Sequence, residues 1–401
     1  MNVVALKSPP FRSYISSLHI ALNGFWAQRV IIGWLAWVLT DSPSFVGLVA
    51  FLNFVPTLFV SPLFGVVADR IDVRIGSIIS YGCAGIATAL FAWICLADAQ
   101  TPLLLAGFSF LTGVISSANH PMRMSLTPRL APPDHLSSVV ALTALNFNLS
   151  RLIGPAIGGA LINILGAASS LMLTALCYGV PVVALWFMRP RDRACDTAPP
   201  PDSYFGALLA GWAYALRLPL VRTALVFSGI GALAGRSVLE TLPLLANGLF
   251  ERGPAGLGFM TAAAGAGAAG AAIFKAMSAA QTQGVFQTQV VVTLFLVPLL
   301  VAGLGLVDNF HVATSIVMLL GGGVTLLGVS LQALVQMAID DHFRGRVMGL
   351  WTTVSIGSGA FGAVIMGVLA DQAGVALAQA MIGLMLAGLA IFMVMRFRSP
   401  G

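Results

Sequence analysis

Charged residues are scarce in this chain: only 8% of its 401 residues are Asp, Glu, Lys or Arg, whereas 58% are hydrophobic. This number of charged residues is too small to cover the surface of a soluble globular protein of this length. The composition therefore excludes a soluble globular protein and indicates a membrane protein. The net charge of +6 would suggest nucleic acid as a partner of a soluble protein. In a membrane protein cytoplasmic arginines account for it, so no nucleic-acid partner is expected.

Cysteine is also scarce, and the motifs of several enzyme classes are missing. The four cysteines form no Cys-x-x-Cys pair and no His cluster accompanies them, so neither a disulfide framework nor a metal site is expected. No Walker A loop is present, which argues against ATP hydrolysis. The string Gly265-Ala-Gly267-Ala-Ala-Gly270 lies within an apolar run, so we interpret it as a helix-packing surface rather than a dinucleotide loop. We therefore expect no enzyme and no cofactor.

Long apolar runs dominate what is present. A membrane-spanning helix needs about 20 mostly apolar residues, and the chain has twelve such runs. They cover roughly residues 13–39, 45–68, 75–97, 101–121, 138–165, 168–188, 221–247, 255–279, 285–306, 311–337, 345–370 and 375–395. The runs predict an all-α membrane protein with twelve transmembrane helices.

Positive charge is distributed unevenly between the two sides of these runs. Sixteen of the 20 Lys and Arg residues fall in the two tails and in alternate loops, whereas the other side has only Arg252. Positive residues that flank spans stay in the cytoplasm, so both termini are predicted to be cytoplasmic. We therefore expect a multi-pass protein of the bacterial inner membrane, with membrane lipids around it.

A charged, proline-rich interruption at residues 189–220 divides the chain into two six-helix halves, 1–188 and 221–401. Its first part is a linker. Its second part, from Tyr204 to Leu216, is amphipathic enough for a short interfacial helix, and it could equally begin the seventh span. A shift of 208 residues superposes Gly154 on Gly362 and Gly159 on Gly367, which favours two parallel copies of one bundle.

The loop after the second run reads Gly65-Val-Val-Ala-Asp69-Arg70-Ile-Asp72-Val-Arg74 and resembles a signature of the major facilitator superfamily, although Asp72 replaces its usual Gly. The resemblance implies the major facilitator fold and transport by alternating access. In this loop a carboxylate at a helix end can face a neighbouring helix N-terminus or pair with an arginine. We predict a conformational latch of Gly65, Asp69, Arg70, Arg74, Arg344 and Arg346, the last two from the basic turn before the eleventh run.

Further segments resemble one branch of that superfamily, which contains the enterobactin exporter and related efflux proteins. They are Gln28-Arg29-Val-Ile-Ile-Gly33-Trp34, Thr40-Asp-Ser42-Pro43, Phe54-Val-Pro56, Asn148 to Gly159 and Gly345 to Trp351. The Gly154-Pro155 and Gly158-Gly159 pairs also resemble a pattern of drug/proton antiporters, in which small residues permit close helix packing and proline allows a bend. The resemblance implies export, although packing alone would produce a similar string.

Ionisable residues inside the apolar runs are the candidate functional residues, because charge at membrane depth usually faces a bundle interior or a wet pathway. Arg29, Arg151 and Arg236 with Glu240 are such residues. Three arginines against one glutamate favour an anionic or polyhydroxylated substrate. We predict a substrate-binding set of Trp26, Arg29, Trp34, Asn146, Arg151, Arg236, Glu240 and Gln336. His19 is a weaker candidate.

Glu240 is the only acid deep in a run, so it is the candidate proton carrier, whose protonation would release Arg236 for substrate. A structural alternative stays open, because an i, i+4 pair can simply neutralise itself and stabilise the seventh span. Arg29 could likewise tie helices together through backbone carbonyls or Asn146.

We therefore predict a monomeric, proton-coupled exporter of a small organic molecule of an anionic, siderophore-like or drug-like class. Two alternatives remain at the level of sequence. The first is an importer or facilitator of a lipid-like or metal-chelate substrate, and the second is a non-transporting membrane sensor or scaffold.

Overall fold

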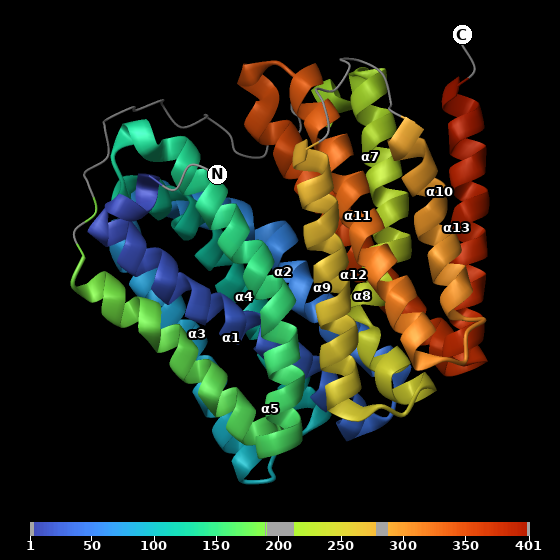
Figure 1. The fold of residues 1–401 in the computed structure, drawn as a ribbon, viewed down its shortest axis with the longest axis horizontal. Coiled ribbons are helices and arrows are strands. Elements are labelled where there is room, and N and C mark those ends of the chain that lie inside the picture. Colours follow the sequence, from blue (N-terminus) through green and yellow to red (C-terminus); the bar gives the residue numbers. More distant parts are fainter. Residues whose placement is uncertain (1–3, 189, 191–211, 278–287, 399–401) are drawn as a thin grey trace. The chain divides into compact units, whose positions relative to one another are not determined.

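The computed structural model describes residues 4–188, 190, 212–277 and 288–398, and all regular structure in these ranges is helical (Figure 1). The long helices are α1 Pro9–Thr40, α2 Pro43–Arg70, α3 Val73–Leu96, α4 Pro102–Leu126, α5 Leu136–Trp186, α7 Pro219–Gly231, α9 Gly253–Met277, α10 Thr288–Leu304, α11 Phe310–Ala338, α12 Asp341–Ala373 and α13 Val375–Arg398. The predicted interfacial helix falls mostly outside the described residues, and residues 212–217 are helical.

Proline and small polar residues set the helix starts. Proline occupies the first turn of α1 and of α4, where its missing N–H group costs no hydrogen bond. Thr101 caps α4 by accepting from the N–H of Leu104 at 3.2 Å, and the side chain of Asn309 accepts from the N–H groups of His311 and Val312 in the first turn of α11. These local signals place the helix boundaries close to those of the apolar runs.

The helix α5 contains two of the predicted spans. Gly166 lies inside it with φ 77° and ψ 167°, a conformation that side-chain-bearing residues rarely adopt. The chain reverses its direction at this glycine, as Figure 1 shows for the two green parts of α5. The break coincides with the short gap between the fifth and sixth apolar runs.

The seventh predicted span differs from a single α-helix. After α7 come a π-helical segment η4, Ala232–Arg236, the short helix α8, Ser237–Glu240, and a second π-helical segment η5, Leu244–Leu249. A π-helix takes more residues per turn than an α-helix, and π-turns are frequent at functional sites. Which residues share a face of this span therefore cannot be taken from a regular spacing of 100° per residue.

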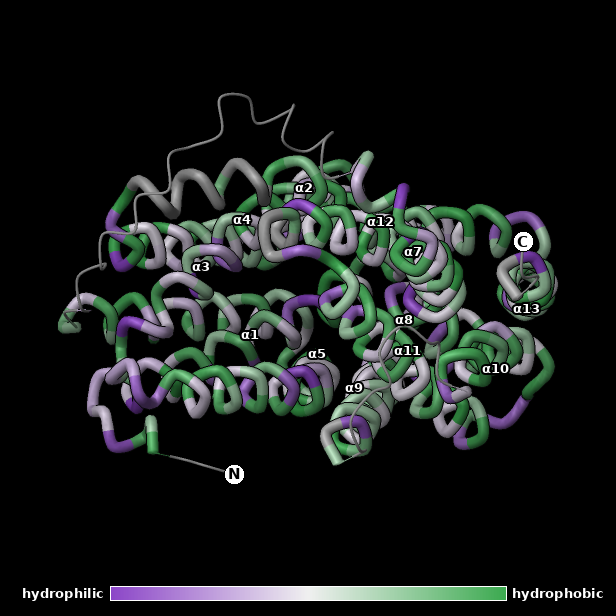
Figure 2. Tube along the Cα trace, turned by 90° about the horizontal axis from the view of Figure 1, so that it is seen from above, coloured by the Kyte–Doolittle hydropathy of each residue, from purple (hydrophilic) through white to green (hydrophobic). Residues whose placement is uncertain are grey.

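Eight helices in the described residues are long and apolar enough to cross a membrane. One of these stretches, Pro133–Trp186, covers two predicted spans, and α10 is a shorter apolar helix. Figure 2 shows hydrophobic residues along most of each helix trace. The protein is an all-helical multi-pass membrane protein.

The chain forms two compact units. Unit 1 contains α1, α2 from Leu52 onward, α3, α4, α5 and residues Arg252–Ala262 at the start of α9. Unit 2 contains Ser42–Phe51 at the start of α2, α7, α8, α9 from Ala263 onward and α10 to α13. Both α2 and α9 thus begin in one unit and continue in the other.

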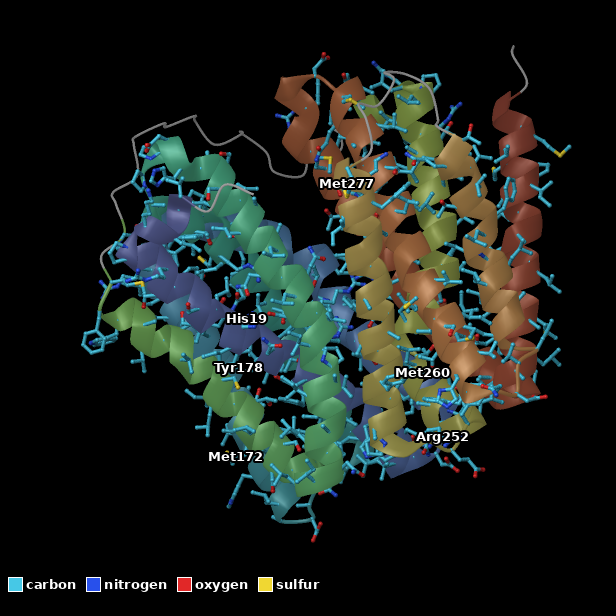
Figure 3. All side chains as sticks on the ribbon, in the orientation of Figure 1. His19, Met172, Tyr178, Arg252, Met260 and Met277 are labelled. Atoms are coloured by element: carbon cyan, nitrogen blue, oxygen red, sulfur yellow. The ribbon has the colours of Figure 1, made fainter. Side chains whose placement is uncertain are left out.

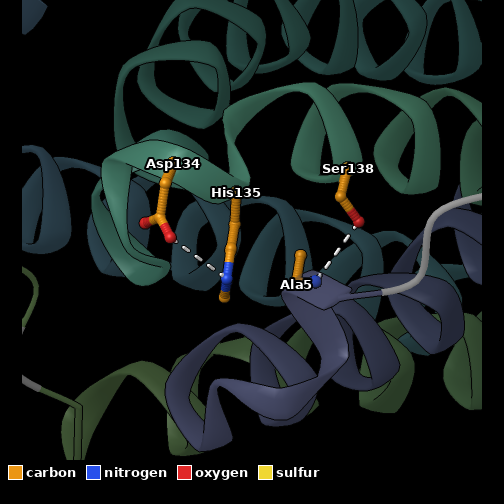
Figure 4. A network of polar contacts seen from close by, with 4 residues as sticks. All are labelled: Ala5, Asp134, His135 and Ser138. Carbon is orange, nitrogen blue, oxygen red and sulfur yellow. Dashed lines mark hydrogen bonds and ion pairs between the residues drawn. The ribbon is translucent and has the colours of Figure 1, made fainter.

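In unit 1, α1 packs against both parts of α5. Phe11, Tyr14 and Leu18 of α1 are fully buried. Buried Gln28 accepts a hydrogen bond from the hydroxyl of Tyr178 at 2.7 Å, and Tyr178 lies on the second part of α5 (Figure 3). The N-terminal 3-10 turn is also fixed, because the N–H of Ala5 donates to Ser138 at 3.2 Å beside the Asp134–His135 pair (Figure 4).

In unit 2, α9 and α11 approach each other through glycines. A Cβ atom at Gly267 would lie 1.8 Å from the carbonyl oxygen of Met318, and one at Gly321 would lie 2.2 Å from that of Ala264. Small residues of this kind let helix backbones touch where no hydrophobic effect drives association. The glycines of the G-x-G-x-x-G string therefore serve helix packing, at least at Gly267.

Candidate functional site

The most concentrated chemistry of unit 1 is a set of aromatic rings with guanidinium groups over them. The guanidinium carbon of Arg29 lies 5.4 Å from the ring centre of Trp26 and 4.5 Å from that of Phe54. The guanidinium carbon of Arg151 lies 5.8 Å from the ring of Trp26, and the Trp26 and Phe147 rings meet edge to face at 5.7 Å. We name these five residues the aromatic–guanidinium cluster. Cation–π contacts of this kind stabilise positive charge in a poorly hydrated environment.

Glycines of α5 bring the cluster together. A Cβ atom at Gly154 would lie 2.6 Å from Cβ of Trp26, and one at Gly158 would lie 2.8 Å from Cα of Ala27. The backbone of α5 therefore contacts α1 directly, which places Arg151 beside Trp26. The glycine pattern that resembles the antiporters has this packing role here.

Closer to the start of α1, this helix and α5 share a polar network around His19. Its Nδ1 atom lies 2.6 Å from Oδ1 of Asn146 and 3.1 Å from the Ser150 hydroxyl, and its Nε2 atom lies 3.2 Å from Nδ2 of Asn23. Backbone carbonyls orient both amides, since Asn146 donates to Ile15 and Asn23 donates to the carbonyl of His19. Because Oδ1 of Asn146 can only accept, Nδ1 of His19 donates to it.

Arg123 extends this chemistry. It lies in the last turn of α4 with its guanidinium carbon 5.6 Å from the ring centre of Phe147. Its Nε atom is buried without a hydrogen-bond partner.

In unit 2 the predicted ion pair is present. Nε of Arg236 lies 3.8 Å from Oε1 of Glu240, with their side chains 32% and 14% exposed. Gly359 of α12 makes room for the arginine, because a Cβ atom there would lie 2.6 Å from Cδ of Arg236. Arg236 ends the π-helical segment η4 and Glu240 ends α8. The pair thus lies where the helix geometry is irregular.

The other predicted substrate-binding residues are more dispersed. Trp34 is half-buried on α1, two turns beyond Trp26. Asn146 is buried and contacts His19 rather than Arg29. Gln336 is exposed on the last turn of α11.

The predicted latch residues are only partly described. Arg74 donates from Nε to the carbonyl of Leu185 at 2.7 Å and from Nη2 to that of Trp186 at 2.5 Å, so it caps the end of α5. Arg346 lies over the ring of Phe343, at 5.6 Å. The remaining latch positions lie outside the residues whose surroundings the structure describes: Gly65, Asp69, Arg70 and Arg344.

Phe54, Phe147 and Arg123 are functional candidates that the sequence pattern does not predict. A phenylalanine in an apolar span carries no signal of function, because most such residues face lipid or fill a helix interface. One signal is available: Phe147 precedes Arg151 by one helical turn, so both lie on one face of α5. No cluster of three or more His, Cys, Asp or Glu residues suited to a metal occurs in the part of the chain that the structure describes.

Relatives of this chain are transporters. The Mycobacterium tuberculosis protein named multidrug efflux pump Tap is 26% identical over 92% of this chain and 88% of its own length. The Escherichia coli protein named enterobactin exporter EntS is 27% identical over 99% of this chain and 96% of its own length. A Staphylococcus aureus protein named staphyloferrin A transporter is 24% identical over 42% of this chain and 43% of its own length.

Solved structures give the same fold. A transporter of the POT family matches with a TM-score of 0.74 at 14% identity, covering 97% of this chain and 96% of that one. The nucleoside transporter NupG matches with a TM-score of 0.70 at 12% identity, covering 97% of this chain and 98% of that one. The family described as transmembrane secretion effector matches residues 3–400. This chain therefore belongs to that family of transporters, has the major facilitator fold and is not an enzyme.

Proposed function

We propose that this transporter exports a small anionic or polyhydroxylated organic molecule by alternating access, in exchange for protons. The observation that carries the proposal is the aromatic–guanidinium cluster, in which Arg29 and Arg151 both lie over the ring of Trp26. Guanidinium groups suit carboxylate or catechol oxygens, while the rings suit a flat substrate. The printed names of two relatives, an efflux pump and an exporter, support the direction of transport.

Glu240 is the proposed proton carrier. It is the acid of the seventh predicted span and lies 3.8 Å from the guanidinium of Arg236. Protonation of Glu240 removes the negative charge of this pair and weakens the electrostatic attraction between Glu240 and Arg236. The net charge of the pair then becomes more positive by one unit. A proton and a substrate that act on the same guanidinium are thermodynamically coupled.

The proposal includes the topology and the surroundings of the protein. We place it as a monomer in the bacterial inner membrane, with both termini in the cytoplasm and six spans in each half, 1–188 and 221–401, joined by the linker 189–220. Support comes from the position of positive charge on alternate loops.

An untargeted comparison of metabolites retained by cells with and without the protein, repeated with an uncoupler, tests the function. We expect one class of anionic or polyhydroxylated compound to accumulate inside cells without the protein, and we expect the uncoupler to remove the difference. Accumulation in the cells that have the protein would instead support import.

Replacing Glu240 with Gln tests the coupling, with the exposed Glu251→Gln as the matched control. We expect Glu240→Gln to abolish uncoupler-sensitive export at unchanged protein level, and Glu251→Gln to leave export intact. Unimpaired export by the first variant would remove Glu240 from the coupling role and leave the Arg236–Glu240 pair as a structural feature.

A further inference from the structure

The same kind of helix–helix contact occurs at two places in this chain. The starts of α2 and α9 share the pattern Pro-x-x-x-Gly, as Pro43 with Gly47 and Pro254 with Gly258, at an offset of 211 residues (254 − 43 and 258 − 47). Each start packs on a glycine of another helix. Those glycines, Gly159 and Gly367, are 208 residues apart (367 − 159), the spacing of the internal repeat.

The two contacts are equally close at the backbone. In unit 2 a Cβ atom at Gly367 would lie 2.5 Å from the carbonyl oxygen of Pro43, and one at Gly47 would lie 2.4 Å from that of Ala363. In unit 1 a Cβ atom at Gly159 would lie 2.6 Å from the carbonyl oxygen of Pro254, and one at Gly258 would lie 2.9 Å from Cα of Gly159. Packing alone therefore does not distinguish the two copies.

Charge does distinguish them. Oδ2 of Asp371, on α12, accepts from the N–H of Ser44 at 3.0 Å and from the hydroxyl of Ser42 at 3.2 Å. Ser42 in turn accepts from the N–H of Phe45 at 3.3 Å. Asp371 is therefore an N-terminal cap for α2, supplied by a different helix, and its negative charge lies at the positive end of the α2 dipole.

The second copy has a neutral version of this arrangement. The repeat offsets place Asn163 at the position of Asp371 (371 − 208) and Gly253 at that of Ser42 (42 + 211). The side-chain oxygen of an asparagine can accept a hydrogen bond from a helix N-terminus, but it brings no charge, and glycine offers no hydroxyl. The two copies thus differ by one carboxylate charge and one hydroxyl group, both of them at the start of α2.

We propose that Asp371 is a one-sided electrostatic latch that holds the start of α2 on α12 and biases the alternating-access equilibrium toward the state in which this contact is made. This inference rests on the proposed alternating-access function. Ser42–Phe51 belongs to unit 2 and the rest of α2 to unit 1. A movement between the units must therefore bend α2 near Phe51 or separate its start from α12, and the latch opposes the separation.

Spin labels on the full-length protein in lipid nanodiscs test the latch without any substrate. The labels replace the exposed residues Ala99 and Asp308 in a variant whose cysteines are changed to alanine, and pulsed electron resonance gives the distance distribution between them. Because a helix cap shifts an equilibrium about fivefold, we expect Asp371→Ala to raise the minor distance population by about that factor. Ser42→Ala removes one of two hydrogen bonds to Asp371, so about a twofold rise is expected.

The natural difference between the two copies supplies a reciprocal pair of nearly isosteric variants. Asp371→Asn replaces the carboxylate at the start of α2 with an amide, the group present in the second copy. This loss of charge alone should raise the minor distance population about twofold. Asn163→Asp introduces at the α9 contact the carboxylate that the first copy has. This substitution should lower the minor distance population by a similar factor.

A neighbouring residue provides the control. Gln372→Ala, one exposed position along α12, should leave the distance distribution unchanged. If Asp371→Ala and Asp371→Asn give the same distribution as Gln372→Ala, the latch is refuted. Asp371→Asn and Ser42→Ala keep the test valid if Asp371→Ala fails to fold, because each retains an acceptor at residue 371.

The outcome is separable from that of the proposed function. A protein that shows the Asp371 shift but exports nothing keeps the latch and loses the export proposal. A protein that exports but whose distances do not respond to Asp371 loses the latch alone.

Discussion

Two glycines of α9, three residues apart, should respond in opposite ways to the same substitution. A Cβ atom at Gly267 would lie 1.8 Å from the carbonyl oxygen of Met318, whereas a Cβ atom at Gly270 would have nothing within 4 Å. Alanine at Gly267 therefore collides with backbone that cannot rotate away. Alanine at Gly270 meets open space and brings only its better helix propensity.

The expected difference in unfolding free energy follows from these distances. To reach an ordinary 3.4 Å contact from 1.8 Å, α9 and α11 must separate by about 1.6 Å, which forfeits much of the dispersion energy along their interface. Overpacking of this kind costs about 1–3 kcal/mol. The propensity gain of up to about 1 kcal/mol is common to both variants, so it cancels from their difference, which isolates the steric cost.

Unfolding by SDS in mixed micelles, followed by tryptophan fluorescence, measures this difference. We expect Gly267→Ala to unfold at lower SDS than Gly270→Ala, by about 1–3 kcal/mol in free energy. On the facing helix α11, Gly321→Ala should behave like the first variant and Gly328→Ala, with open space around it, like the second. Equal midpoints within both pairs would refute the backbone contact between α9 and α11.

Three other substitutions test the remaining contacts. Arg74→Gln removes the cap on the last carbonyls of α5 and should lower the unfolding free energy by about 1 kcal/mol in the same SDS titration. Asn146→Leu deprives the buried His19 network of its acceptor and should lower it by about 1–3 kcal/mol. Trp26→Leu removes the ring over which two guanidinium groups lie, so the export rate of the metabolite found by profiling should fall about tenfold or more while the SDS midpoint changes less.

The membrane architecture is predictable because its signals are local. A span needs only consecutive apolar residues and a boundary signal, and both are visible in the sequence of α2, where the apolar run covers roughly 45–68 and the helix covers Pro43–Arg70. The break at Gly166 likewise matches the short gap between two runs. The all-α membrane class therefore follows from the apolar runs alone, whereas the major facilitator fold is implied by the motifs.

The irregular seventh span could not be predicted from the same rules. Hydropathy counts apolar residues and does not register one additional residue in a turn, so the π-helical segment that ends at Arg236 has no signature in composition. A Cβ atom at Gly235 would lie 2.3 Å from Val324 and 2.9 Å from Val297. This part of the helix is constrained by neighbours distant in sequence, which the local pattern cannot contain.

The sequence predicts the charged residues of the candidate site and the ring of Trp26, and it does not predict the two phenylalanine rings. Arg29 and Arg151 are recognisable because charge is costly at membrane depth. Phe54 and Phe147 are not, because their role depends on which helices meet: the first belongs to α2 and the second to α5. The sequence leaves Arg29 either lining a pathway or tying helices together through backbone carbonyls or Asn146, and the structure adds two aromatic rings beside the cation.

The distribution of acids constrains how a proton can be coupled to transport. The sequences of α1, α3, α4 and α5 contain no Asp or Glu, whereas they contain the arginines of the cluster and two histidines, His19 and His120. In these four helices no carboxylate can exchange a proton against a substrate. We therefore expect coupling to depend on Glu240, so that Glu240→Gln uncouples export even in a protein whose aromatic–guanidinium cluster is intact.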